Sequence, residues 1–344
     1  MPEPSQKSSK RITLADVAAK AGVSVQTASH VMAENLTVRL PAATRERVKD
    51  AANTLGYEPN RIARAMKTGK TNMVSVWMPV DRPNYFFLRS LREISRVTRQ
   101  SGYDLMIVGL ESAQAYGEQH RLPHQWPVDG LMSLDAGRAM KLYREKPGNA
   151  TTPLVVFGSE SFEFADTVSW DVKGSVESTI NRFIQSGLKQ IVHLTPDWMI
   201  ERFPIEQRRT GYRLAMESNG LEPELIACPG ESSNDGFSAM EKYLESNPPP
   251  EMVFCFLDSI GIGAIRALTA AGLSVPQDCQ VLGFSNSPDA EDSRIPMSSI
   301  GVQIVPMIER GWELLAARIN NPNITSTLEV FDMEFVERSS TRIS

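Results

Sequence analysis

The stretch ITLADVAAKAGVSVQTASHVM, residues 12–32, predicts two helices joined by a tight turn. Its apolar residues follow helical spacing up to Gly22, which can take the positive φ at which a helix ends, and Thr13 is a favourable N-cap residue. Ser24 is the expected N-cap of the second helix, whose outward arc is formed by Val25, Gln26, Ser29 and His30. This pattern is typical of a helix-turn-helix unit, in which N-terminal side chains of the second helix contact base edges in the major groove of DNA.

A third helix is expected over residues 43–55, after Pro41 and before Gly56. It is followed by GYEPNRIARAMKTGKT, residues 56–71. Residues 12–71 resemble the DNA-binding headpiece of the LacI/GalR (lactose-repressor) family almost position for position. The resemblance rests on the patterns T-L-x-D-V-A-x-x-A-G-V-S-x-Q-T-x-S, T-R-E-x-V and G-Y-x-P-N-R-x-A. It implies a transcriptional regulator that binds a specific operator sequence.

The segment from Pro59 to Lys67 is shorter than the roughly 12–15 residues that an isolated helix needs in water. The resemblance implies that it is a hinge helix, which orders on operator DNA beside the same helix of a dimer partner. Met66 occupies the position of the apolar wedge that opens a base step in the minor groove. The residues predicted to contact DNA are Thr13, Leu14, Ser24, Val25, Gln26, Ser29, His30, Arg39, Asn60, Arg61, Ala63, Arg64 and Met66.

Charge is distributed unevenly along the chain. Residues 1–70 contain 12 Lys and Arg against 6 Asp and Glu, whereas the whole chain has a formal net charge of −5. The remaining residues therefore carry −11, and the positive charge is confined to the segment that resembles a headpiece. Neutralising DNA phosphates requires local positive charge of this kind, although a solvated basic face would have the same composition.

From Met73 onward, short apolar runs alternate with amphipathic segments. Strands are expected over residues 73–79, 103–109, 128–134, 153–158, 189–194, 251–257 and 280–284, and helices over 87–101, 174–186, 206–219 and 259–271. Buried runs alternating with helices predict a doubly wound α/β fold. The family resemblance implies a type I periplasmic-binding-protein-like sensor with two subdomains and a ligand between them. The expected organisation is a disordered tail (1–10), a helix-turn-helix headpiece (11–58), a hinge helix and linker (59–71) and a sensing and dimerisation domain (72–344), with an N-subdomain of 72–170 and 301–331 and a C-subdomain of 171–300 and 332–344.

Several classes of protein are not supported by the sequence. The N-terminus is polar, and no apolar run of about 18 residues could span a membrane, so we expect a cytoplasmic protein without a membrane partner. Three widely spaced cysteines favour buried thiols over disulfides or a metal site. Metal-ligand spacing, a nucleophile elbow and a P-loop are also absent, so neither an enzyme nor a cofactor or metal is expected.

The effector site can be predicted only from the resemblance. Arg208 matches the family arginine that grips a polar group of the ligand, and Phe237 the aromatic residue that stacks on a sugar or base. Phe86 and Phe87 occupy positions that line the cleft in relatives, although a core role is nearly as consistent for each. Asp258 is expected to cap the helix that follows it.

Three polar ligand positions of the family pattern are replaced by Gly158, Leu257 and Ser285. A site without those groups would bind a sugar poorly, and the retained Arg208 would leave it more positive than usual. The sequence therefore predicts a homodimeric repressor of a catabolic operon, which binds a palindromic operator and responds to a small, anionic effector. The alternative is a regulator of the same family whose sensor no longer binds a small molecule.

Overall fold

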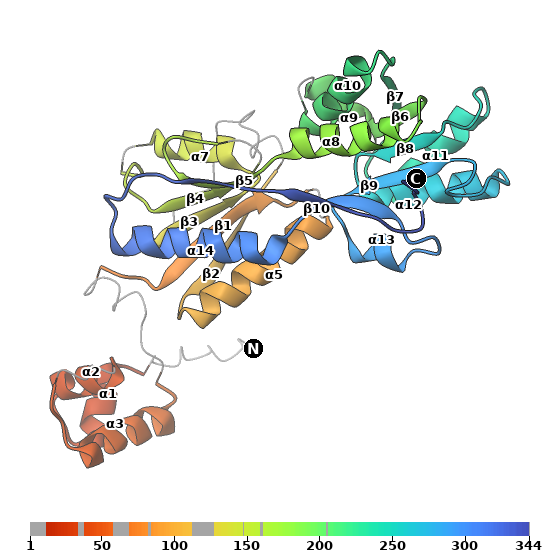
Figure 1. Ribbon diagram of the computed structural model, residues 1–344. Coiled ribbons are helices and arrows are strands. Elements are labelled where there is room, and N and C mark those ends of the chain that lie inside the picture. The colour runs from red at the N-terminus through yellow and green to blue at the C-terminus, as the bar shows by residue number, and fades with distance from the viewer. Residues whose placement is uncertain are drawn as a thin grey trace, which may run out of the picture. The chain divides into compact units, whose positions relative to one another are not determined.

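The structure is a computed structural model that describes residues 12–33, 38–57, 69–81, 84–111, 127–146, 148–158, 161–203 and 206–343. The chain forms two compact units, Met1–Asn72 and Met73–Ser344, which we call the headpiece and the sensor domain (Figure 1). The residues predicted for the tail and for the hinge contacts, namely 1–10, Asn60, Arg61, Ala63, Arg64 and Met66, lie outside the described part of the chain.

The headpiece contains α1 (Leu14–Ala21), α2 (Val25–Met32) and α3 (Ala42–Leu55). A capping box begins α1, since the Thr13 hydroxyl accepts from the Asp16 N–H and the Thr13 N–H donates to the Asp16 carboxylate over 2.8 Å. Gly22 and Gly56, with φ of 65° and 64°, end α1 and α3 in the left-handed conformation. The three predicted helices are confirmed, with α3 beginning one residue earlier than expected, at Ala42.

The core of the headpiece is small and consists largely of alanine and valine. Val17, Ala28 and Val48, one from each helix, have no exposed surface. Short side chains let the three helices approach closely, and no described residue of the sensor domain belongs to this cluster. The headpiece therefore has a hydrophobic core of its own.

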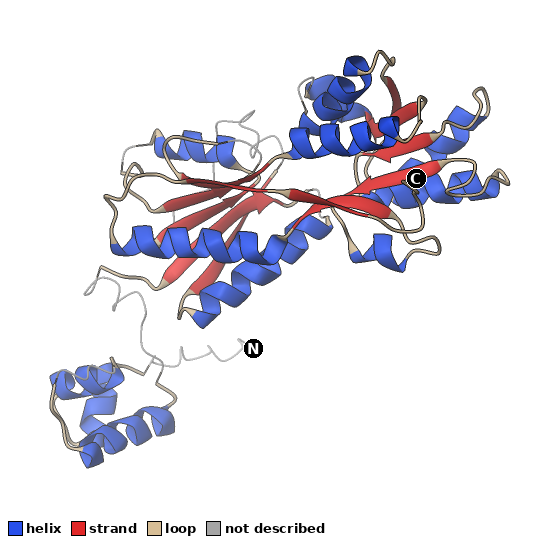
Figure 2. Cartoon of the chain, viewed as in Figure 1, coloured by secondary structure: helices blue, strands red, loops and turns tan. Residues whose placement is uncertain are grey.

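The sensor domain contains two six-stranded sheets (Figure 2). In spatial order, sheet A consists of β11 (Leu328–Phe331), β5 (Asp166–Trp170), β4 (Leu154–Phe157), β3 (Gly130–Leu134), β1 (Met73–Pro79) and β2 (Asp104–Leu110). Sheet B consists of β12 (Met333–Val336), β10 (Ser298–Val302), β9 (Gln280–Phe284), β8 (Met252–Cys255), β6 (Ile191–Pro196) and β7 (Glu224–Cys228). Neighbouring strands are parallel except β10 and β12.

Helices cover both faces of each sheet, as the predicted doubly wound α/β fold requires. On sheet A, α5 (Tyr85–Gln100) and α14 (Ile304–Asn320) pack on one face and α7 (Gly137–Arg144) on the other. On sheet B, α8 (Val172–Gln185) and α10 (Gln207–Ser218) lie opposite α11 (Ser233–Leu244) and α12 (Asp258–Ala270). The short helices α9 (Asp197–Arg202) and α13 (Pro288–Asp292) follow β6 and β9.

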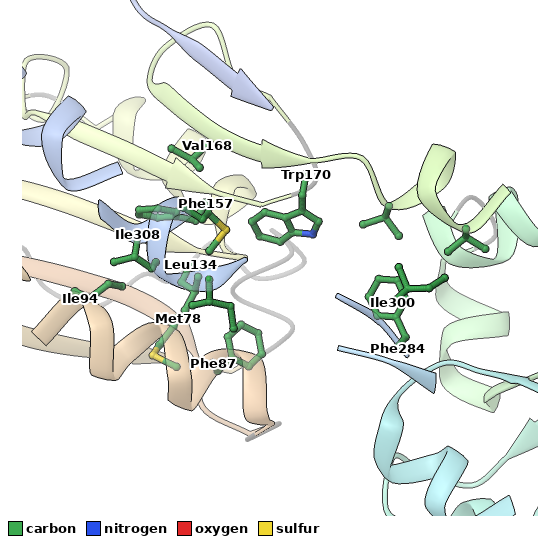
Figure 3. Packing of buried hydrophobic residues seen from close by; sticks show 14 of the residues in the cluster. Met78, Phe87, Ile94, Leu134, Phe157, Val168, Trp170, Phe284, Ile300 and Ile308 are labelled. Carbon is green, nitrogen blue, oxygen red and sulfur yellow. The ribbon is translucent and has the colours of Figure 1, made fainter. Parts of the chain in front are cut away.

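Strand residues alternate between these layers. Val76 faces α5 and α14 whereas Trp77 joins the cluster around α7. Figure 3 shows the first of these layers, with Ile94 of α5 and Ile308 of α14 beside the strand residue Phe157. Such burial on both faces explains why the apolar runs of the sequence are continuous rather than alternating.

The chain passes between the two sheets at three places. It leaves sheet A after Trp170, returns after Val302 to form α14, and enters sheet B again after Phe331. The expected division between residues 300 and 301 falls inside β10, which continues to Val302. The three crossings bring the carboxyl ends of strands from both sheets close to one another, where ligands of open α/β sheets bind.

A buried histidine lies in β6. His193 has no exposed surface, its Nδ1–H donates to the Phe254 carbonyl oxygen over 3.0 Å, and its ring stacks on Phe254 with centroids 4.7 Å apart. Burial lowers the pKa of His193 from 6.5 to about 4, although the hydrogen bond to Phe254 and the nearby Glu206 oppose that change. The neutral ring is therefore the form that the fold stabilises.

This lowered pKa predicts a loss of stability in acid. Because the folded-state pKa lies below the unfolded one, the contribution is complete above pH 6.5 and is lost as the pH falls through about 4. We expect His193→Phe to reduce the fall in the free energy of unfolding between pH 7 and pH 4 by about 3 kcal/mol. Urea titrations of both proteins across this range measure the difference, and parallel curves would contradict the assignment. His30→Phe, which changes a histidine of the headpiece, is the matched control.

Candidate functional site

The first candidate site is the outward face of α2. Its N-cap Ser24 accepts from the Thr27 N–H over 3.1 Å, and Ala28 and Val31 bury the inner face. On the outer face, Val25 is 50% exposed and Gln26 is exposed, while Ser29 and His30 are half-buried. These four residues form the arc predicted from helical spacing.

The remaining described residues of the DNA-binding prediction differ in their surroundings. The Thr13 hydroxyl is engaged within the headpiece, because it donates a hydrogen bond to the Asp16 carboxylate over 2.7 Å. Leu14 is half-buried against the headpiece core. Arg39 is exposed in the segment before α3. Of these three, Arg39 has the side chain most accessible to a phosphate.

The second candidate site is a cavity of about 460 Å³ in the sensor domain. It lies where the carboxyl ends of strands from sheets A and B converge, as Pro79, Trp170, Phe284 and Val302 each end a strand and line it. Figure 3 shows Phe87 and Trp170 on the sheet A side and Phe284 on the sheet B side. Six residues predicted for the effector line this cavity: Phe86, Phe87, Gly158, Arg208, Leu257 and Ser285.

Arg208 is held in place by several contacts. It is the second residue of α10, whose N-cap Glu206 accepts from the Arg209 N–H over 2.9 Å and lies 3.2 Å from Arg208 Nε through its other carboxylate oxygen. Arg208 Nη1 donates to the Phe256 carbonyl oxygen over 3.1 Å. The guanidinium carbon lies 3.8 Å and 4.6 Å from the ring centroids of Phe256 and Phe284. The cation is therefore fixed and stacked between two rings.

The expectation that the cleft is unusually positive is wrong for the described lining. Asp135, Glu206 and Glu231 line it together with Arg138 and Arg208, so carboxylates outnumber guanidinium groups. A Cβ on residue 158 would stand 3.8 Å from Asp135 Oδ1, so a carboxylate lies beside the position at which Gly158 lacks one. Sequence comparison with the family pattern could not reveal this compensation, because Asp135 follows a different strand.

Asp258 does not cap α12, contrary to the expectation. Leu257 is the N-cap residue, and the buried Asp258 is the first residue of the helix. Its carboxylate accepts from the Ser287 N–H and the Ser299 hydroxyl, each over 2.6 Å. Burial raises the pKa of Asp258, while these hydrogen bonds oppose the shift. Asp258 therefore connects α12 to the segments after β9 and in β10.

The prediction for Phe237 is not supported by the cavity. Phe237 lies on α11, where Arg266 stands over its ring at 5.3 Å from the centroid, and it is not among the described residues of the lining. The family pattern places Phe237 at a position that contacts the ligand in relatives. In this structure α11 packs against α12, and Phe237 packs against the core of sheet B.

Sequence reasoning missed most of the aromatic lining. Besides Phe86 and Phe87, the sheet A side contributes Phe162 and Trp170, and the sheet B side contributes Trp198, Phe203, Phe256 and Phe284. One signal could have identified some of them. Trp170 and Phe284 are the last residues of strands and Phe256 follows one, and the carboxyl ends of parallel strands form the ligand crevice of this fold.

A helix-turn-helix unit joined to a two-sheet sensor with a cavity at the strand ends defines a class of ligand-responsive DNA-binding regulators. Residues 13–60 match the model of bacterial regulatory proteins of the lacI family, and residues 180–341 match that of periplasmic binding protein-like domains. The chain therefore has a lacI-family helix-turn-helix domain followed by a periplasmic-binding-protein-like domain, and its relatives are transcriptional regulators.

The chain is similar to known proteins and to solved structures over nearly its full length. Catabolite control protein A of Priestia megaterium is 27% identical over 96% of this chain and 99% of its own length, and CelR of Thermobifida fusca is 29% identical over 96% and 98%. The lac repressor dimer bound to operator and the anti-inducer ONPF has the same fold, with a TM-score of 0.78 at 19% identity, covering 96% of this chain and 99% of that one.

These relatives are transcriptional regulators, and the chain is a DNA-binding regulator of transcription rather than an enzyme. Within the described residues, no group of His, Cys, Asp and Glu side chains could hold a metal ion. Cys228, Cys255 and Cys279 are buried thiols whose pKa is raised by burial. None of the described helices combines the length and hydropathy needed to cross a membrane.

Proposed function

We propose that the chain is a cytoplasmic, homodimeric repressor of a catabolic operon, which binds a palindromic operator and is controlled by a small effector in the sensor cavity. The outward arc of Val25, Gln26, Ser29 and His30 on α2 carries the DNA-binding part of this proposal. In the same proposal, residues 59–71 form a hinge helix, over Pro59–Lys67, and a linker, and the hinge helix binds the minor groove. A catabolic role is supported by relatives such as the ribose operon repressor of Escherichia coli.

Dimerisation is supported by an apolar surface on sheet A. The strand β2 lies at the edge of the sheet, and it carries Ile107 with 52% of its surface exposed. Leu88, in the first turn of α5, is 61% exposed. Exposed large apolar side chains on and beside an edge strand favour a protein partner, and a second copy of the chain would match a palindromic operator.

An effector is supported by the cavity itself. Its volume of about 460 Å³ lies within the range of about 300–1,000 Å³ typical of small-molecule sites. A sensor that had lost its ligand would not need to keep an arginine stacked and oriented at that place. The cavity therefore favours an effector-binding sensor over the alternative without one.

Gel-shift assays on the DNA that adjoins the protein's own gene test the proposed function. The full chain should shift a palindromic fragment, whereas a chain lacking residues 1–71 should not. Equal shifts by both proteins would contradict the assignment of DNA binding to the headpiece.

The headpiece contacts predict two kinds of variant. Gln26→Ala should reduce discrimination at one or two operator positions by about 1–3 kcal/mol, because its amide is expected on a base edge. Arg39→Ala should weaken binding to all sequences alike and make the salt dependence shallower, because its charge is expected on a phosphate. Binding to a randomised operator library at several salt concentrations separates these effects, and identical profiles for the two variants would contradict the proposed contacts.

A further inference from the structure

Among the described residues that line the sensor cavity, eight are Phe or Trp and eight are polar or charged. The aromatic residues are divided equally, with four on the sheet A side and four on the sheet B side. On the sheet A side, Phe86 lies between Phe87 and Trp170, with ring centroids 5.7 Å and 5.2 Å away. These three rings form a continuous apolar wall, and Phe87 and Trp170 are less than 10% exposed.

The opposite wall contains the stacked cation. The rings of Phe256 and Phe284, which are 4% and 6% exposed, hold the Arg208 guanidinium between them. Arg208 Nη1 donates to the Phe256 carbonyl oxygen, and Arg208 Nε is buried beside Glu206 without a hydrogen bond. Among the described residues no acceptor is bonded to Nη2, so this nitrogen can donate to one group of a ligand.

A sugar is a poor match for the wall formed by Phe86, Phe87 and Trp170. Each hydroxyl that leaves water needs a hydrogen-bond partner, and a hydroxyl placed against an aromatic wall loses binding energy. Of the positions that supply carboxylate and amide groups in the family pattern, Leu257 and Ser285 carry neither group, whereas the Asp135 carboxylate lies beside Gly158. A flat apolar molecule instead gains from stacking and from the area that it removes from water.

We propose that the sensor cavity selects a flat aromatic molecule whose single acceptor group, a carboxylate or carbonyl, binds Arg208, and that it binds such a molecule more tightly than a neutral sugar. This inference rests on the proposed function, in which the same cavity is the effector site. In this proposal, aromatic stacking rather than the net charge of the cleft determines which effector binds.

The test uses 1-anilinonaphthalene-8-sulfonate, an aromatic probe with one anionic group, and the full chain. Its fluorescence should report saturable binding, and trans-cinnamate should displace it. We expect Phe86→Leu to raise the Kd of the probe about fivefold through lost stacking, and Arg208→Gln to raise it about tenfold through the lost charge-assisted hydrogen bond. In Arg208→Gln, Glu206 keeps its hydrogen bond from the Arg209 N–H, so α10 retains its cap.

Two control variants repeat the same chemical changes outside the cavity. Phe237 and Arg266 form a ring and cation pair on α11 and α12. Phe237→Leu and Arg266→Gln should therefore leave the Kd of the probe unchanged. Equal changes in the cavity and control variants would overturn the proposal, as would the lack of saturable binding.

Cellobiose and ribose are the competing ligands. Displacement of the probe by either sugar would overturn the proposed selection, whereas failure of both to displace it supports the proposal. The titrations need no DNA, so the two proposals can fail separately. Binding in the cavity without any change in operator affinity would contradict the regulatory role of the cavity and leave its ligand class supported.

Discussion

Replacing Arg318 by methionine should lower the free energy of unfolding of the sensor domain by about 3–5 kcal/mol. Arg318 Nε and Nη2 donate to the two carboxylate oxygens of Asp166, over 2.5 Å and 2.9 Å, and the Asp166 side chain has no exposed surface. Without its partner, the Asp166 carboxylate would remain buried with one hydrogen bond, from the Thr327 N–H. A buried charge left in this state costs several kcal/mol.

The effect should be large because this pair joins three parts of the chain. Asp166 begins β5, Arg318 lies in the last turn of α14, and Arg318 Nη1 also donates to the Ile324 carbonyl oxygen over 3.0 Å. That segment leads into β11, which pairs with β5. The ion pair therefore positions the edge of sheet A as well as the end of α14.

Urea unfolding of the two proteins measures the loss, and Arg310→Met is the matched control. Arg310 lies on the same helix and pairs with Glu313 and Glu329, but its side chain is 39% exposed. Exposed pairs contribute about 0–1 kcal/mol, so this variant should remain close to the parent. Equal losses in both variants would contradict the importance given to the burial of Asp166. Adding Asp166→Leu to Arg318→Met should recover part of the stability, since it removes the unpaired charge.

Ala28→Gln should reduce operator affinity about a hundredfold by unfolding the headpiece. Ala28 has no exposed surface and faces the small core shared by α1 and α3. The longer side chain overpacks that core, which lowers the free energy of unfolding by about 1–3 kcal/mol. Burying its amide without a hydrogen-bond partner lowers it by about another 1–3 kcal/mol. A unit of this size has little stability to lose, and apparent affinity falls with the fraction that remains folded.

Ala19→Gln makes the same substitution at an exposed position of α1 and should bind DNA nearly as the parent does. Gel shifts measure the affinities, and calorimetry should show an unchanged melting temperature for the sensor domain in both variants, because the two units have separate cores. A sensor domain that melts earlier in Ala28→Gln would contradict that independence.

The headpiece could be predicted almost completely because its signals are local. Thr13, Ser24, Gly22 and Gly56 specify where helices begin and end through their own backbone and nearest neighbours. The apolar spacing of α1 and α2 then determines which faces are buried. Each of these interactions spans a few residues, so it can be recognised without knowing the rest of the structure.

The strands of the sensor were predictable only where they are apolar on both faces. The strands β1, β4, β8 and β9 consist largely of apolar residues, and they were expected at nearly the observed bounds. By contrast, β5 has the sequence DTVSW, and its buried Asp166 is paired with Arg318, 152 residues away in the sequence. The strands β11 and β12 are four residues long, contain one glutamate each and lie at the edges of their sheets, and their pairing is decided by the last crossing between the sheets.

The sequence by itself determined the class of the protein, the helix-turn-helix arc and the α/β character of the sensor, because propensity, capping and hydrophobic periodicity act over short distances. Only the tertiary structure decided the chemistry of the cavity. It brings Asp135 beside Gly158, positions Arg208 between Phe256 and Phe284, and leaves Phe237 outside. These contacts form where the ends of strands that are distant in the sequence converge. The charge of the cavity, the stacking of Arg208 and the position of Phe237 outside the lining therefore depend on packing between segments rather than on any single segment.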